Sequence, residues 1–176
     1  YWKPDGQLCA KRKFRAYVSV WISKFLPHKS RFSVKMEIYS TDQAHQILKS
    51  LSLNRTAGFA GIGIVFYQDL KKVSHIELGH STVDRPHLPI YRVEEIIFTL
   101  VSVADISSPW HDGFHFICSN PVSLTHLSQF IAPSLQLYDS TPLRERPSGA
   151  RHMTAVLVSN SAGVDCVGLL TSNGEI

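Results

Sequence analysis

The segment 58–67, Gly-Phe-Ala-Gly-Ile-Gly-Ile-Val-Phe-Tyr, constrains the fold of this chain more than any other. From Phe59 to Tyr67 it carries no charged side chain, and it is too short and too rich in glycine for a buried helix. A continuous apolar run of this kind is typical of a central strand whose two faces are both covered. The glycines lack the G-x-G-x-x-G spacing and no helix start follows them, so a dinucleotide fingerprint is not expected.

The remaining segments show alternating strand and helix patterns. Apolar and polar side chains alternate over 31–39, which predicts a half-buried strand, and Ser40-Thr41-Asp42-Gln43 is a capping-box start for a helix to Leu53. Together these patterns predict an α/β (α+β mixed) fold with a central mixed β-sheet flanked by helices. The other predicted elements are helices at 93–104, at 123–130 and from Arg151 onward, strands at 114–118 and 164–171, and a polar loop at 140–148.

Composition fits one compact domain. The chain has 176 residues, of which 44% are hydrophobic, and no apolar run approaches the roughly 20 residues that span a bilayer. The three cysteines lie far apart without metal-ligand spacing, which favours reduced, buried thiols and a cytoplasmic location. Residues 1–40 are expected to form a basic N-terminal extension, and residues 41–176 a domain that is truncated at its C-terminal end. The basic residues early in the chain are Lys11, Arg12, Lys13, Arg15, Lys24, Lys29, Arg31 and Lys35.

Two short motifs carry the candidate chemistry. Pro109-Trp110-His111-Asp112-Gly113-Phe114 places a carboxylate on an Asp-Gly turn, and Ser148-Gly149-Ala150-Arg151-His152-Met153 places an arginine and a histidine at a helix start. With the elements that precede them, they resemble the Asp-Gly-Ala and Gly-Thr-Arg-His-Arg motifs of the diadenylate cyclase (DAC) domain family. The resemblance runs from about residue 41 to the end of the chain. Domains of that family join two ATP molecules into cyclic di-AMP.

The resemblance implies a role for each motif. Asp112 corresponds to the carboxylate that activates a ribose 3′-hydroxyl, and the helix that opens with Gly149-Ala150-Arg151-His152 would turn its N–H groups toward phosphates. A Mg²⁺ or Mn²⁺ ion would accompany the nucleotide near Asp112 and His152. The expected catalytic residues are Asp112, Arg151 and His152. The expected nucleotide-binding residues are His111, Asp112, Gly113, Phe114, Pro133, Ser134, Leu135, Gly149, Ala150, Arg151 and His152.

Several positions depart from the family pattern. Phe114 replaces a small alanine, and strand alternation leaves open whether its ring fills the pocket or packs in the sheet core. Ala150 and Met153 replace a threonine and an arginine, which removes one hydroxyl and one cation from the phosphate end. The family's Leu-Pro-Leu element is matched approximately by residues 131–135, and its Ser-Glu-Glu element by Thr171-Ser172-Asn173, which has no carboxylate. Losses of this kind reduce transition-state stabilisation more than ground-state binding.

The chain is therefore predicted to be a nucleotide-binding sensor domain derived from a diadenylate cyclase, most similar to the family's divergent sensor relatives. Its expected partners are ATP, another nucleotide or a cyclic dinucleotide, together with an attached effector module; nucleic acid is not expected. The alternative is an active diadenylate cyclase that uses Mg²⁺ or Mn²⁺. An active cyclase needs two sites face to face, and hence a homodimer or larger oligomer.

A third hypothesis comes from the histidines. His111-Asp112-x-x-His115, together with His152, has residue types that bind zinc or iron, so a metal-dependent hydrolase is a further alternative. Against it, the sequence shows no pattern of hydrogen-bonding residues that would orient these side chains as metal ligands. Trp110, beside the Asp-Gly corner, is either a plug in the core or a platform for base stacking, and the core is favoured.

Overall fold

The computed structural model of the chain describes residues 31–78, 85–140, 147 and 149–176. Within these residues five strands form one sheet in the order β2-β4-β3-β1-β5. The pair β1–β3 is parallel and the other pairs are antiparallel, which confirms a mixed α/β architecture. The helices are α1 (Arg31–Leu53), α2 (Val93–Val103), α3 (Leu135–Ser140) and α4 (Ala150–Ser159); the strands are β1 (Ile62–Tyr67), β2 (His75–Glu77), β3 (Phe114–Ser119), β4 (Val122–Ile131) and β5 (Val164–Leu170).

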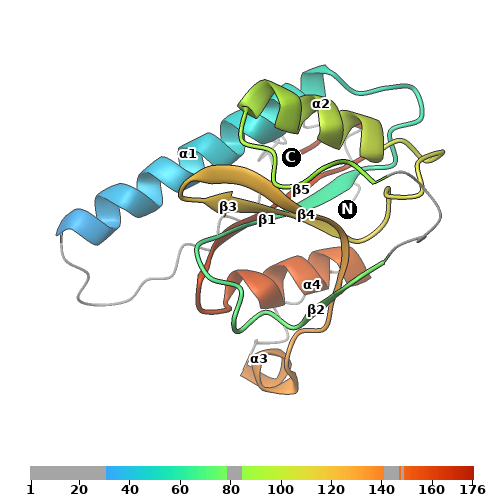
Figure 1. Cartoon of the computed structure of the whole chain (residues 1–176). Helices are drawn as coiled ribbons and strands as arrows, with labels where there is room; N and C mark the ends of the chain where they lie inside the picture. The colour runs from blue at the N-terminus through green and yellow to red at the C-terminus, as the bar shows by residue number, and fades with distance from the viewer. Residues whose placement is uncertain (1–30, 79–84, 141–146, 148) are drawn as a thin grey trace, which may run out of the picture.

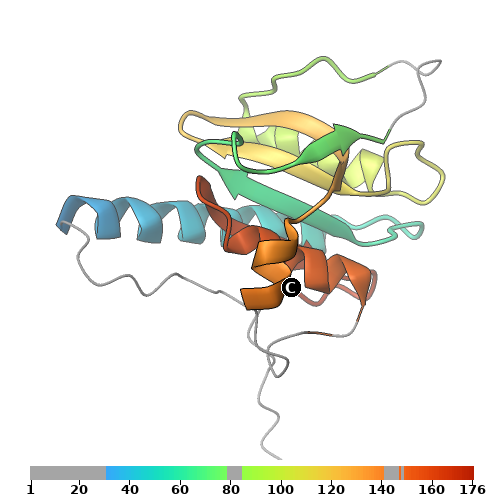
Figure 2. The same cartoon turned by 90° about the horizontal axis from the view of Figure 1, so that it is seen from below.

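Helices cover both faces of the sheet. Helices α1 and α2 lie on one face, and α4 lies on the other (Figure 1). The larger apolar cluster packs α1 and α2 against the sheet, and the smaller one packs Ala155 and Val158 of α4 against the opposite face. Figure 2 gives the same layering from below. The sheet is therefore the middle layer of three.

Strand β1 is the buried centre that its composition predicts. All six of its residues are buried. Ile62, Ile64 and Phe66 belong to the larger cluster, whereas Val65 and Tyr67 belong to the smaller one. The prediction of a strand covered on both faces is confirmed, because apolar side chains that alternate between the two faces each enter a packed layer.

The predicted strand at 31–39 is wrong, because α1 runs without interruption from Arg31 to Leu53. No glycine or proline interrupts this stretch, so each further residue adds one helical hydrogen bond, which outweighs a weak alternation of side chains. Ser40-Thr41-Asp42-Gln43 accordingly lies inside the helix and does not cap it. The helix also crosses residue 40, where the basic extension was expected to end.

The predicted helix at 123–130 is also wrong, because these residues lie in strand β4. The pairing of β4 with β3 shifts register twice, between Phe116 and Ile117 and between Phe114 and Phe116. Each β-bulge inserts an extra residue and so interrupts the alternation of side chains. Leu124 and Leu127 therefore both enter the larger cluster although they are three residues apart, which is the spacing that imitates a helix.

The predicted helices at 93–104 and from Arg151 onward and the predicted strands at 114–118 and 164–171 are confirmed, whereas Ser140, the first residue of the predicted loop, ends helix α3. The structure has helices at α2 and α4 and strands at β3 and β5, close to the predicted bounds. Cys166 in β5 is buried, and burial raises the pKa of its thiol to about 12, whereas Cys118 in β3 is half-buried. Cys9, the basic residues before Arg31 and residues 141–146 and 148 of the predicted polar loop lie outside the described residues. Among the described helices, none is long and apolar enough to cross a membrane.

Candidate functional site

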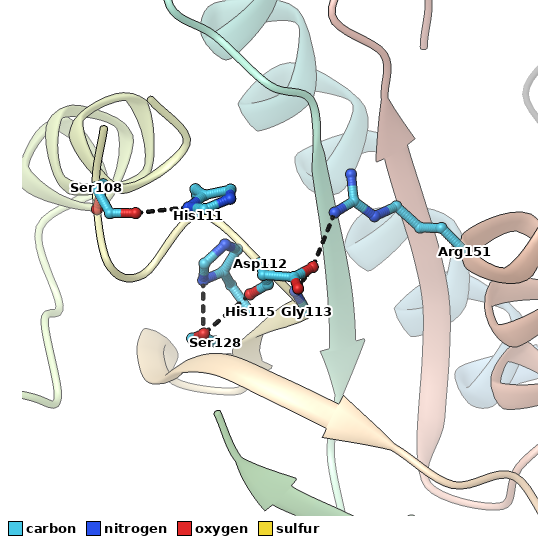
Figure 3. Close-up of polar contacts among 7 residues, drawn as sticks. All are labelled: Ser108, His111, Asp112, Gly113, His115, Ser128 and Arg151. Atoms are coloured by element: carbon cyan, nitrogen blue, oxygen red, sulfur yellow. Dashed lines mark hydrogen bonds and ion pairs between the residues drawn. The ribbon is translucent and has the colours of Figure 1, made fainter. Parts of the chain in front are cut away.

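The two motifs singled out in the sequence meet in space. Asp112 lies just before β3, and Arg151 lies in the first turn of α4. Nη2 of Arg151 is 3.6 Å from Oδ1 of Asp112, and Figure 3 shows the guanidinium directed at the carboxylate. The side chain of Asp112 is 73% exposed and that of Arg151 is 35% exposed. This ion pair therefore contributes little to the stability of the fold. An accessible, weakly held pair of opposite charges is therefore available to a ligand.

The Asp-Gly corner is fixed by the neighbouring strand. Gly113 has φ +77°, and a Cβ at this position would lie 2.6 Å from the carbonyl oxygen of Gln129. Only glycine accommodates that conformation and that close approach without strain. Ser128 Oγ donates a hydrogen bond of 3.0 Å to the carbonyl oxygen of Asp112, and the Gly113 N–H donates one of 2.8 Å to Oδ1 of Asp112. Strand β4 thus holds the backbone at Asp112 and Gly113, and with it the position of the Asp112 carboxylate.

The opposite side of the site is the start of α4. Gly149 precedes the helix with φ +96°, and a Cβ built there would meet no atom of the described residues within 4 Å, its chain neighbours aside. Within the described residues no side chain caps this end, and the first helical hydrogen bond runs from the Met153 N–H to the Gly149 carbonyl at 3.0 Å. Ala150 and His152 are exposed. Free backbone N–H groups and the positive end of the helix dipole make such a terminus suited to an anion.

Phe114 packs in the core. The residue is 5% exposed and belongs to the cluster between the sheet and α4. Its ring lies over Gly63 of β1, where a Cβ would come within 2.7 Å of the ring carbons. Gly63 therefore makes room for the bulky residue that replaces the family's alanine. The alternative in which this ring fills a ligand pocket is excluded by the packing.

The two residues before Asp112 are held by other contacts. Trp110 is 5% exposed and belongs to the larger cluster, with the guanidinium of Arg85 at 5.9 Å from the ring centroid, so the prediction of a core residue is confirmed. His111 donates from Nδ1 to the carbonyl oxygen of Ser108 over 2.6 Å, which leaves the lone pair on Nε2. His111 is half-buried and lies beside the Asp112 corner (Figure 3).

His115 does not join His111 in a metal site. His115 is completely buried, and its Nδ1 accepts a hydrogen bond of 3.2 Å from the Ser128 N–H. Burial, with the charge of Arg151 as a smaller cause, lowers the pKa of His115 to about 3, so the ring is neutral. Across the described part of the chain, no three His, Cys, Asp or Glu side chains are grouped so as to hold a metal ion. The metal-hydrolase hypothesis gains no support from this arrangement.

The remaining expected binding residues, 133–135, stand where β4 leads into α3. Pro133, Ser134 and Leu135 form the passage from β4 into α3, and Leu135 is 79% exposed. Among the described residues, no hydrogen bond or ion pair links this passage to Asp112 or Arg151. The segment Thr171–Asn173 forms a turn in which the Thr171 N–H donates to the carbonyl of Glu175 over 2.8 Å. Neither segment is brought into the site by a described contact.

Ser128 is a residue that the sequence pattern did not identify. It lies in the stretch predicted as a helix, and its φ of +51° is the only positive value of a non-glycine residue in the described part of the chain. No local signal in the sequence marks this position, because the conformation arises from the bulged pairing of β3 with β4. Its contacts nevertheless reach both Asp112 and His115 (Figure 3).

Comparisons with known proteins do not identify a family. No protein-family model matches the chain, and no curated protein sequence matches it significantly. The likeness to diadenylate cyclase domains therefore depends on the two motifs and on the order of elements around them.

Proposed function

We propose that this chain is a nucleotide-binding sensor domain related to diadenylate cyclases, with a nucleotide phosphate bound at the start of α4. The observation that carries the proposal is the convergence of Asp112 and Arg151, within 3.6 Å of each other, at a helix N-terminus that no described side chain caps. The two residues come from motifs far apart in the sequence. Their meeting at an anion-binding terminus is what a nucleotide site of this family requires.

The charges of the site suit a phosphate. Arg151 offers a planar donor with several N–H groups, and the first N–H groups of α4, the helix that carries Arg151, are further donors. Because the ion pair with Asp112 is largely exposed, a phosphate can take over the guanidinium with little loss of stability. Asp112 would then remain beside the ribose, held through its backbone by Ser128.

The departures from the family motifs favour a sensor over an enzyme. Ala150 and Met153 take the places of a hydroxyl donor and a second cation at the phosphate end. Such contacts are worth a few kcal/mol each in a transition state, while binding retains the helix terminus and Arg151. Phe114 is not an obstacle to binding, because its ring is in the core.

The proposal includes the partners that such a domain would have. ATP, another nucleotide or a cyclic dinucleotide is the ligand, and an attached effector module and a second copy of the chain are the protein partners. Mg²⁺ or Mn²⁺ would arrive with the nucleotide, held mainly by phosphate oxygens as is usual for these ions, and Asp112 and His152 are the side chains offered to it. The proposed location is the cytoplasm.

A nucleotide panel tests binding. We expect ATP or a cyclic dinucleotide to raise the melting temperature of the native protein in a concentration-dependent way, since a ligand that binds only the folded state stabilises it. Arg151→Gln is expected to abolish most of that rise. Arg92→Gln is the matched control, because Arg92 is 73% exposed and pairs with Glu95 on α2, away from the site. An equal rise in all three proteins would contradict the proposal.

The second candidate is an active diadenylate cyclase. It is favoured by the retention of an accessible carboxylate at Asp112 beside Arg151. Concentrated protein incubated with ATP and Mn²⁺ or Mg²⁺, followed by chromatography and mass spectrometry, distinguishes the two. A sensor yields no cyclic di-AMP, whereas product that disappears in Asp112→Asn would make the chain an enzyme.

A further inference from the structure

We propose that Ser128 and His115 form a clamp that sets the position of Asp112, and that nucleotide affinity depends on this clamp. The inference rests on the proposed function for its binding consequence, but the clamp itself has a readout that needs no nucleotide. Both residues are positioning residues, because neither is placed to touch a ligand at α4: each is buried and acts through the Asp112 corner.

Ser128 joins three parts of the fold at one backbone position. Its Oγ donates to the carbonyl of Asp112 at 3.0 Å, and its own carbonyl accepts a hydrogen bond of 2.7 Å from the Leu78 N–H, next to β2. Its N–H donates to Nδ1 of His115 in β3. The residue sits in a bulge with φ +51°, a conformation that costs a non-glycine residue free energy. A strained residue whose polar groups are all hydrogen-bonded indicates a specific structural task.

His115 supplies the acceptor that holds the Ser128 backbone in this conformation. Since the Ser128 N–H donates to Nδ1, the proton of the neutral ring is on Nε2. Nε2 is buried and has no hydrogen-bond partner among the described residues. A buried donor without a partner is unfavourable, so stability alone does not account for a histidine here. Its acceptor at Nδ1 accounts for it.

Two substitutions of His115 separate a positioning role of the ring from a stabilising one. His115→Leu removes the unpaired Nε2–H but leaves the Ser128 N–H without an acceptor. The variant therefore has one buried N–H group without a hydrogen bond, as the native protein does. His115→Asn keeps an acceptor oxygen where Nδ1 stands. The two variants both shorten or reshape the side chain, yet only Asn preserves the bond to Ser128.

Four variants test the clamp. Ser128→Gly and Ser128→Ala both delete the bond to Asp112; glycine relieves the backbone strain and alanine does not. Ser123→Ala is the matched control, because Ser123 is buried in the same strand and its Oγ bonds the carbonyl of Pro121, away from the site. His115→Leu and His115→Asn complete the set. We measure the affinity for ATP by calorimetry and the exchange rate of the Gly113 amide by NMR.

The expected result has two parts. Both Ser128 variants and His115→Leu weaken ATP binding about five- to tenfold, the loss expected for one hydrogen bond, while Ser123→Ala and His115→Asn bind within about twofold of the native protein. The same three variants speed exchange of the Gly113 amide about tenfold, because the corner loses its anchor on β4.

Failure of the clamp and failure of the proposed function give different results. Unchanged Gly113 exchange in Ser128→Gly and His115→Leu would overturn the clamp whatever the protein binds. Absence of any nucleotide binding by the native protein would overturn the proposed function, and the exchange rates would still decide the clamp. Faster exchange with unaltered affinity would refute the dependence of binding on the clamp.

Discussion

The two halves of the candidate site are built in opposite ways. The Asp112 corner is tied to β4 by the hydrogen bond from Ser128 and by the close approach of Gly113 to the Gln129 carbonyl. The start of α4 has no side-chain cap among the described residues, and none of their atoms lies within 4 Å of a Cβ built at Gly149, its chain neighbours aside. The carboxylate is therefore placed before a ligand arrives, whereas the first N–H groups of α4 have no side-chain cap in the described part of the chain.

This difference indicates what the ligand has to provide. An anion satisfies the N–H groups at the helix start and the guanidinium of Arg151, so phosphate is the natural group for that half. The corner needs no such partner to hold its shape, and its carboxylate would meet the neutral part of the ligand. A nucleotide combines both requirements in one molecule.

The two glycines give the largest expected contrast. Both have positive φ, but a Cβ at Gly113 meets the Gln129 backbone at 2.6 Å and one at Gly149 meets no such atom of the described residues. Gly113→Ala is therefore expected to lower the free energy of unfolding by more than about 3 kcal/mol, and Gly149→Ala by less, about 1–3 kcal/mol, the cost of the conformation alone. Urea denaturation of the two variants measures this contrast. Equal losses would mean that the corner is no more tightly held than the helix start.

Substitution of the two charges is expected to change nucleotide affinity in opposite directions. Arg151→Gln removes a charged donor from the phosphate and weakens ATP binding by about 1.5–3 kcal/mol. Asp112→Asn keeps an acceptor oxygen for the ribose but removes a negative charge near the phosphates, so in the absence of a divalent cation their repulsion falls and the affinity rises. Calorimetry on both variants at equal salt concentration measures the two effects. A loss of similar size in both would show that Asp112 contacts the ligand through its charge.

Lowering the pH is expected to reduce the stability of the folded protein through His115, which lies behind the Asp112 corner. The folded protein holds the pKa of this ring at about 3, below the usual 6.5, so below about pH 6.5 the unfolded chain binds a proton that the folded chain does not. Stability present above pH 6.5 is then lost as the pH falls, by about 1.4 kcal/mol per pH unit once well below 6.5. His115→Asn has no such group, so its stability declines less steeply between about pH 6 and pH 4. Parallel curves for the two proteins would place the acid sensitivity elsewhere.

The sequence predicted the parts of the fold that depend on composition over a whole segment. The apolar run of β1 and the spacing in α2 are of this kind, because each element buries the faces that its pattern implies. The motif residues Asp112 and Arg151 were also found from sequence, since an Asp-Gly turn and a helix start are local features. Their mutual approach needed the tertiary structure.

Features that depend on pairing between strands were not predictable in this way. The bulges of β4 give Leu124 and Leu127 a helical spacing, so the local pattern indicated the wrong element. Ser128 and His115 acquire their roles only through that bulged pairing. The direction of the Phe114 ring likewise depended on the space above Gly63, a residue of another strand.

The most direct test of the account is an NMR titration of the amide-labelled native protein with ATP. Binding at the proposed site predicts the largest shifts at the amides of Ala150, Arg151 and His152, with smaller shifts at Gly113. The same titration of Arg151→Gln is expected to leave these amides nearly unchanged. Shifts confined to other elements, or none at saturating ATP and cyclic di-AMP, would contradict a nucleotide site between the Asp112 corner and α4.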